Sequence, residues 1–484
     1  MILEVSQKQD YIFSSKKLKD NVERSQIIQY VTSNQFFENA APDLYKESEN
    51  MIYAGGGHTV LQFATASQAK TFAKTVTAIA IQQFQDLELF VKQIVYDETK
   101  TPAENFRQLS AALEAKKALR RSSLRRLKFG IEAEEISSIY NSHVPIESIA
   151  PPKGYRFSNE FSQVCGEDSF LAVVHIDGNA MGKRVENLYQ SVGEDFDTCC
   201  QSLRRFSEGI QSDFEQAFAE TAQEVAKCEQ NSMYLRMRPI VLAGDDVCFV
   251  CAGEIGLECA RIFLERLAAR KNQEDGLPYA ACAGIAVVHA KYPFHEAYGL
   301  SEALCSSAKK YSASLDDTGN ISAMDFHISF GQLQHSLTDI RGSYRTEDGG
   351  FLHLRPLVVV SPQEYHKKDD FFMIRNYNFF KTLCQSLQQD SRTVSRGKLK
   401  ELRTACKQGQ IEADYFLQKE SIQNVIDHIW EAEMKQEDIF EMIKSILEHK
   451  KQLSKSVFFK VGTEQRCLLF DAIEWMDHYK SIDI

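Results

Sequence analysis

The sequence predicts an α+β protein in which a ferredoxin-like unit occurs twice and a mainly helical region follows. Two observations support this prediction. The order strand, helix, hairpin, helix, strand can be followed through residues 1–97 and again through residues 170–290. Each passage also has a glycine-bearing hairpin turn, AGGG at 54–57 and AGDD at 243–246. A repeated order of elements with matching turns suggests a diverged internal duplication.

The first copy is expected at residues 1–100. Its strands are short apolar or β-branched runs, and its helices have apolar residues at helical spacing. Ser67 is the expected N-cap of the second helix. The expected elements are a strand at 1–5, a helix at 14–31, a hairpin at 50–63, a helix at 66–85 and a strand at 87–97.

The second copy is expected at residues 156–330. Its first strand, FLAVVHID, is an apolar run that ends in Asp177, and its hairpin carries Asp245 and Asp246 in the turn. The expected elements are a strand at 170–177, a helix at 196–228, two strands within 233–253, a helix at 254–271, a strand at 279–290 and a helix at 295–313.

Two further segments complete the predicted organisation. Residues 101–155 are expected to form a basic helix and a linker, with the proline pair at 151–152 marking a boundary. The stretch KKALRRSSLRRLK at 116–128 either grips RNA backbone or a partner protein, or is a solvated face. Residues 331–484 are expected to hold a strand hairpin, beginning near 351–362, and a helical C-terminal domain.

Composition limits the classes of protein to consider. The chain has 484 residues and a formal net charge of -11, so a nucleic-acid site would have to be a local basic patch. The N-terminus has no signal-like pattern and no apolar run reaches the ~18 residues of a membrane span, so we expect a cytoplasmic protein without a membrane partner. The 12 cysteines show no disulfide framework. Cys248 and Cys251 are expected in the core of a strand rather than on zinc.

The acidic residues of the second copy predict a metal site. In a ferredoxin-like sheet the first strand and the hairpin are neighbours, so Asp177, Asp245 and Asp246 should converge. Converging carboxylates repel each other unless a cation joins them, and Mg²⁺ prefers oxygen ligands. Two such ions could activate a hydroxyl and stabilise a pyrophosphate leaving group. The alternative is a solvated turn, since Gly-Asp is ordinary turn chemistry.

A phosphate site is predicted after Asp177. In GNAMGK the glycines allow a close turn, and backbone N–H groups at a helix start attract phosphate. The alternative is a simple strand-to-helix turn. Lys309, near the end of the helix EALCSSAKK, is the lysine expected to approach a triphosphate. The predicted nucleotide-binding residues are Gly178, Asn179, Ala180, Met181, Gly182, Lys183, Gly244 and Lys309.

Three motifs, HIDGNAMGK, LAGDDVCF and CAGIAVVHAKYPFHEAYGLSEALCSSAKK, resemble the polymerase/cyclase palm. More narrowly, the chain resembles the large subunit of type III CRISPR effector complexes. That resemblance implies two palm domains, the first without catalytic carboxylates and the second with a Gly-Gly-Asp-Asp motif. It also implies synthesis of cyclic oligoadenylates from ATP when target RNA is bound. The GGDEF diguanylate cyclases and class III nucleotidyl cyclases are more distant relatives.

The resemblance implies roles for individual residues. Asp177, Asp245 and Asp246 would be catalytic and, together with Ile176, would form the metal-binding set for Mg²⁺ or Mn²⁺. Four features depart from the family pattern. Ala243 replaces the first glycine of the motif, and Asn179 stands where many members have a second acid. A His-Asp nuclease motif and a paired C-x-x-C zinc finger are also missing.

The leading hypothesis is a nucleotidyltransferase that joins NTPs, with ATP as the expected substrate, into a cyclic or linear oligonucleotide signal for antiviral defence. The partners to be considered are RNA, other CRISPR-type effector subunits and a second copy of the chain. A second hypothesis is a catalytically inactive palm scaffold that binds nucleotide, RNA or proteins. A third is a stand-alone dinucleotide cyclase of the GGDEF kind, against which the first copy and the helical tail argue.

Overall fold

The computed structural model describes most of the chain. Most of the basic stretch predicted at 116–128 lies outside the described residues, and so does part of the predicted C-terminal domain. The described residues are 1–84, 86–119, 149–166, 169–193, 195–228, 232–330, 336–362, 374–389, 395–420, 456–461 and 464–482.

The first sheet has four strands in the order β2-β3-β1-β4, all paired antiparallel, which is a ferredoxin-like arrangement. Leu3 and Val5 of β1 are fully buried, as alternation along a strand with one face on a core requires. The strands are β1 (Ile2–Ser6), β2 (Met51–Gly55), β3 (His58–Leu61) and β4 (Glu88–Lys92). The helices are α1 (Lys8–Phe13), α2 (Leu18–Val31), α3 (Asn34–Ala40), α4 (Glu47–Asn50) and α5 (Ala66–Gln83).

The start of α5 corrects one prediction. Its N-cap is Thr65 rather than Ser67, and the Thr65 side chain accepts from the backbone N–H of Gln68 while the Gln68 side chain accepts from that of Thr65. This reciprocal pair is a capping box. It satisfies two helix-start donors, whereas a start at Ser67 would lose that pairing.

The second sheet has six strands in the order β10-β9-β8-β5-β7-β6. Its first four strands in sequence repeat the order of the first sheet, and β9 then adds parallel to β8. The strands are β5 (Phe170–Gly178), β6 (Met237–Ala243), β7 (Asp246–Ala252), β8 (Ala281–His289), β9 (Ser322–Ser329) and β10 (Leu357–Val360). The helices are α9 (Met181–Val192), α10 (Phe196–Cys228), α11 (Gly256–Ala268) and α12 (Phe294–Leu315).

Helices cover both faces of the second sheet. Gly256 of α11 packs against Ala172, whereas α12 crosses Gly284 on the other face so closely that a Cβ there would lie 1.9 Å from a backbone oxygen of α12. Strands covered on both faces are expected to be apolar throughout, and residues 171–174 of β5 are all fully buried or nearly so. The face under α12 is the one that carries the site described below.

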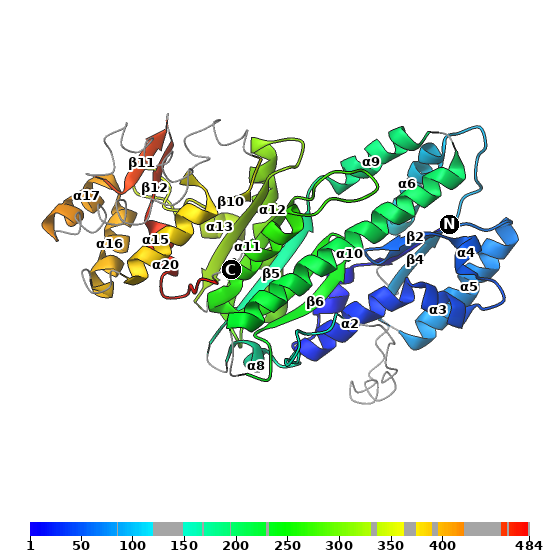
Figure 1. Cartoon of the computed structure of the whole chain (residues 1–484), viewed down its shortest axis with the longest axis horizontal. Helices are drawn as coiled ribbons and strands as arrows, with labels where there is room; N and C mark the ends of the chain where they lie inside the picture. The colour runs from blue at the N-terminus through cyan, green and yellow to red at the C-terminus, as the bar shows by residue number, and fades with distance from the viewer. Residues whose placement is uncertain are drawn as a thin grey trace.

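The two ferredoxin-like units pack against each other. Arg204 of α10 donates to the carbonyl of Ile52 on β2 at 3.1 Å, and Gln29 of α2 donates to the carbonyl of Leu242 on β6 at 2.9 Å. Each sheet therefore has an edge strand covered by a helix of the other unit, which shields its unpaired backbone groups. In Figure 1 the first unit (blue), the second (green) and the C-terminal part (yellow to red) follow one another along the molecule. The remaining connecting elements are the 17-residue helix α6 (Pro102–Ala118) and the short α8 (Phe161–Cys165) and η2 (Gly253–Ile255).

The described C-terminal part is tied to the second unit by buried charge. The carboxylate of Glu258 on α11 accepts from the hydroxyls of Tyr377 at 2.6 Å and Tyr479 at 2.8 Å. The elements here are α13 (Leu337–Gly342), α15 (Tyr377–Gln389), α16 (Arg396–Gln408), α17 (Gln410–Lys419), β11 (Phe458–Val461), β12 (Glu464–Cys467) and α20 (Phe470–Trp475). Among the described helices, none combines the length and the apolar character that crossing a membrane requires.

Candidate functional site

Two of the predicted acidic residues are direct neighbours. Asp177 is the last residue but one of β5, Asp246 begins β7, and the two residues are cross-strand partners in the antiparallel ladder. Directly opposite residues point to the same face, with Cβ atoms about 5 Å apart. Asp245 lies in the turn just before β7, which turns at Gly244 with φ 67°. The hairpin therefore brings two carboxylates together and places a third beside them.

Asp245 packs against Gly178 at the end of β5. A Cβ at Gly178 would lie 2.8 Å from the Asp245 Cβ, so a side chain there would displace the carboxylate. Burial raises the pKa of Asp245 to about 6, and the charges of Asp177 and Asp246 add to this effect. The aspartates at this hairpin thus interact electrostatically, and their negative charge is only partly compensated.

Lys309 supplies one compensating charge. It lies on α12, with its Nζ 2.6 Å from Oδ2 of Asp177, and it donates to the carbonyl of Gly178 at 2.9 Å. Its side chain is one-third exposed. The sequence predicted Lys309 near a triphosphate; in the structure it is within reach of the acidic pair and bound to one member of it.

His175 belongs to the site, although it was not predicted from the sequence. It is buried in β5, two residues before Asp177 and on the same face, and its Nε2 lies 3.4 Å from Oδ1 of Asp246. Burial opposes the charged form, but the carboxylates of Asp246 and Asp177 outweigh burial and raise the pKa of His175. The histidine in HIDG at i−2 was the available signal, because residues two apart share a strand face.

The turn after β5 holds the remaining predicted nucleotide-binding residues. Ala180 has φ 56°, a conformation that is rare outside glycine, and α9 begins directly after it at Met181. Space beside Gly182 is open. The Lys183 ammonium donates to the carbonyl of Asp317 at 2.8 Å, so it is bound to the loop that follows α12.

Asn179 and Ile176 are held inside the fold. The side chain of Asn179 donates to the carbonyl of Ile321 at 2.9 Å and its backbone N–H donates to Ala280. These two bonds hold the turn against the residues just before β8 and β9. The side chain of Ile176 is fully buried in β5, on the face opposite to that of Asp177.

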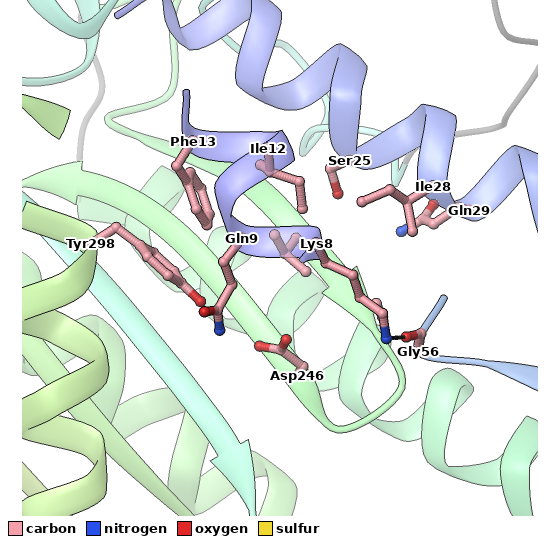
Figure 2. A pocket seen from close by; sticks show the side chains of 12 residues that line it. Lys8, Gln9, Ile12, Phe13, Ser25, Ile28, Gln29, Gly56, Asp246 and Tyr298 are labelled. Carbon is pink, nitrogen blue, oxygen red and sulfur yellow. Dashed lines mark hydrogen bonds between the residues drawn. The ribbon is translucent and has the colours of Figure 1, made fainter. Parts of the chain in front are cut away.

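A pocket joins this site to the first unit. Figure 2 shows Gln9 and Phe13 of α1 on the side of Asp246 and Tyr298, and Lys8 extending toward Gly56. Lys8 donates to the carbonyl of Gly56 in the AGGG turn. Burial lowers the pKa of Lys8, although nearby carboxylates, among them Asp246, act in the opposite direction. The approach of α1 to Asp246 and Tyr298 could not be predicted from the sequence, because these residues lie more than 200 positions from α1 in the chain.

The donor set suits a divalent cation. Among the described residues, no three His, Cys, Asp or Glu side chains form a ready-made metal cluster. Oδ1 of Asp246 is buried and has the imidazole Nε2 of His175 at 3.4 Å, a distance too long for a good hydrogen bond. Burial and the neighbouring aspartates outweigh Lys309 at Asp245 and raise its pKa. Mg²⁺ is typically held by one or two carboxylates, with substrate phosphates and water completing the shell. Asp177, Asp246 and Asp245 fit that requirement.

A ferredoxin-like sheet with acids at the end of its first strand and in its hairpin turn has the arrangement of a polymerase/cyclase palm. Sequence comparison supports this class. Residues 170–316 match the family model "Cas10/Cmr2, second palm domain". No curated protein matches the chain.

Solved structures with a similar fold include chains of Csm1–Csm4 assemblies. The chain matches the Csm1–Csm4 cassette in complex with cA4 with a TM-score of 0.57 and 12% identity, over 99% of this chain and 69% of that one. The apo cassette gives the same values, and the cassette in complex with AMPPNP gives 0.56 and 13% over the same shares. A Csm1–Csm4 subcomplex of the type III-A CRISPR–Csm interference complex matches over 66% of this chain and 53% of that one, with 15% identity and a TM-score of 0.46.

Residues 170–316 are therefore similar in sequence to the Cas10/Cmr2 second palm domain, and nearly the whole chain has a fold similar to that of a chain in the Csm1–Csm4 cassettes. The predicted α+β fold class is confirmed. We therefore refer to the two ferredoxin-like units as the first and second palm. The chain spans between about half and about two thirds of the structural relatives' own length.

Proposed function

We propose that the second palm is a nucleotidyltransferase that joins NTPs into a cyclic or linear oligonucleotide. The observation that carries this proposal is that Asp177 lies directly opposite Asp246 where β5 ends and β7 begins, with Asp245 in the adjoining turn. A ribose hydroxyl of one nucleotide would attack the α-phosphorus of another. The new P–O bond forms as the bond to the β-phosphate oxygen breaks, pyrophosphate leaves, and the hydroxyl proton passes to solvent.

Asp177, Asp245 and Asp246 are the residues that would hold Mg²⁺ or Mn²⁺. Bound divalent ions would neutralise triphosphate charge and make the attacking hydroxyl more acidic. Lys309, which pairs with Asp177 in this structure, would bind the triphosphate instead when nucleotide is present. The triphosphate carries more negative charge than a carboxylate that holds a metal ion, so it would be the stronger partner for the ammonium group. The backbone N–H groups at the start of α9 would contact phosphate oxygens, whereas those of Gly178 and Asn179 already donate to the carbonyls of Asp245 and Ala280.

ATP is the proposed substrate, and CRISPR-type antiviral defence is the proposed context. Support comes from the structural relatives, which include the Csm1–Csm4 cassette in complex with AMPPNP, with cA4 and with pppApApA. By the same analogy, a Csm4-like subunit is a candidate partner. RNA as an activator and a homodimer remain predictions from the sequence.

The proposal can be tested by turnover. Purified protein is incubated with ATP or GTP, with Mg²⁺ or Mn²⁺, and with or without RNA, and pyrophosphate and oligonucleotides are measured. We expect product with ATP and its loss in Asp246→Asn and Asp177→Asn, whereas Asp43→Asn, a change at an exposed residue of the first palm, should retain activity. Turnover that persists in both aspartate variants would refute the assignment.

A second candidate, a non-catalytic scaffold, has a specific observation in its favour. The amide of Asn179 is committed to the carbonyl of Ile321, and Lys309 already neutralises Asp177. A palm in which Lys309 pairs with Asp177, and in which Asn179 stands in place of an acid, could bind a nucleotide without catalysing a reaction. Retained ATP binding by calorimetry together with absent turnover under every condition would favour this candidate.

A further inference from the structure

A stack of three rings connects the first palm to Asp246. Phe13 of α1 lies against Tyr298 of α12, with ring centroids 3.8 Å apart and planes 27° apart. Tyr298 in turn lies against His175 of β5 at 5.5 Å and 16°. The imidazole Nε2 of His175 is 3.4 Å from Oδ1 of Asp246. Four residues from four elements thus form a continuous row from one palm into the other.

Each ring in the row is tightly enclosed. Phe13 and Tyr298 are each 4% exposed and His175 is 5% exposed. Aromatic rings have few rotatable bonds and cannot adjust independently in a close-packed interior. Because a shift of Phe13 would leave a void beside Tyr298, the Tyr298 ring and the imidazole stacked on it would have to follow.

The first palm holds its end of the row firmly. Gln9 of α1 donates to Glu302 of α12 at 2.9 Å, next to the Phe13–Tyr298 contact. Gln7, which caps α1, has φ 51°. Gln7 and Ala180 are the two non-glycine residues in the described chain with positive φ, and each precedes the first helix after the first strand of its palm. A strained backbone conformation persists only where surrounding contacts impose it.

We propose that Phe13, Tyr298 and His175 are positioning residues through which the first palm sets the orientation of the Asp246 carboxylate. In its catalytic part this inference rests on the proposed function. The first palm then has a mechanical role in the second palm's site that does not require it to carry carboxylates of its own.

The test has a readout that needs neither metal nor turnover. In protein labelled with ¹⁵N-histidine, the imidazole signals are recorded, and that of His175 is assigned by its loss in His175→Gln. We expect the His175 signal to shift in Asp246→Asn, Phe13→Leu and Tyr298→Leu, and to shift less in Tyr298→Phe, which keeps the ring. The matched control is Phe84→Leu, which truncates another buried phenylalanine of the first palm, one that packs on Tyr30.

Turnover of ATP is measured on the same proteins. A misplaced carboxylate should lower kcat about 10- to 100-fold in Phe13→Leu and Tyr298→Leu, while KM for ATP stays within about twofold. Phe84→Leu should keep the wild-type kcat and KM even if its melting temperature falls as much as those of Phe13→Leu and Tyr298→Leu. This separates positioning from general destabilisation.

The outcomes are distinguishable. An unchanged His175 signal in Phe13→Leu, or an equal shift in Phe84→Leu, would overturn the inference whatever the activity. If the signal shifts as expected but wild-type protein shows no turnover, the coupling between the palms stands and the proposed function fails.

Discussion

Replacing Asp245 by Asn should stabilise the protein while removing its proposed activity. Burial and the neighbouring aspartates raise the pKa of the Asp245 carboxyl from 3.8 to about 6. The folded state therefore prefers the neutral carboxyl more than the unfolded chain does. Below about pH 4 the residue is protonated in both states and carries no penalty; as pH rises through about 6, the penalty of the buried charge appears in full.

The magnitude follows from the size of that rise. An increase in pKa from 3.8 to about 6 corresponds to about 3 kcal/mol, at roughly 1.4 kcal/mol per pKa unit. Asn approximates the neutral carboxyl in shape and removes the charge. At pH 8 the free energy of unfolding of Asp245→Asn should therefore exceed that of wild type by up to about 3 kcal/mol, and the difference should shrink towards zero near pH 4.

The assay is urea denaturation at a series of pH values between 4.5 and 8 without divalent metal, repeated with Mg²⁺. The control is Asp43→Asn, at an exposed position of the first palm. Mg²⁺ should stabilise wild type and narrow the gap to Asp245→Asn, because it binds the charged carboxylates of the folded state. A difference between the two proteins that is the same at pH 4.5 and pH 8 would refute the argument about buried charge.

Three further outcomes are expected. Lys309→Met should lower ATP turnover at least about 100-fold by removing the cation beside Asp177, with an unchanged circular dichroism spectrum. Gly284→Ala should abolish soluble expression, since its Cβ would lie 1.9 Å from backbone oxygen in α12, whereas Gly299→Ala, with open space at its Cβ, should express normally. Arg355→Met should cost about 3–5 kcal/mol of unfolding free energy in denaturation experiments, because it leaves the fully buried Asp471 without its partner.

Much of the second palm could be predicted because its strands are apolar and bounded by turns. The strand β9 was missed for a physical reason. Its sequence, SAMDFHIS, contains four buried polar residues, Ser322, Asp325, His327 and Ser329. Asp325 is tolerated there because Arg341 binds it from α13. A local pattern cannot reveal a strand whose burial depends on a partner elsewhere in the chain.

The residues of the site also fall into those that the sequence predicted and those that it did not. The aspartates at 177, 245 and 246 could be predicted because charge inside apolar runs is costly and needs a reason. Tyr298 could not, because an isolated tyrosine in an apolar element is an ordinary core residue until its neighbours are known. For His175 the only signal was its position two residues before Asp177, on the same strand face. The packing of α12 and α1 near the ends of β5 and β7 could not be predicted from the sequence.

The first palm shows why one site, rather than two, is expected. Its counterpart of the Asp177 strand ends in Ser6, and its hairpin turn, AGGG, has no acid. The one carboxylate in β1, Glu4, is neutralised by Lys117 at 2.8 Å. In the second palm, by contrast, Asp246 has a buried oxygen that accepts no hydrogen bond from the described chain. Uncompensated negative charge, the physical requirement for binding a divalent cation, is therefore concentrated on the second palm, while the first palm contributes shape and contacts through α1.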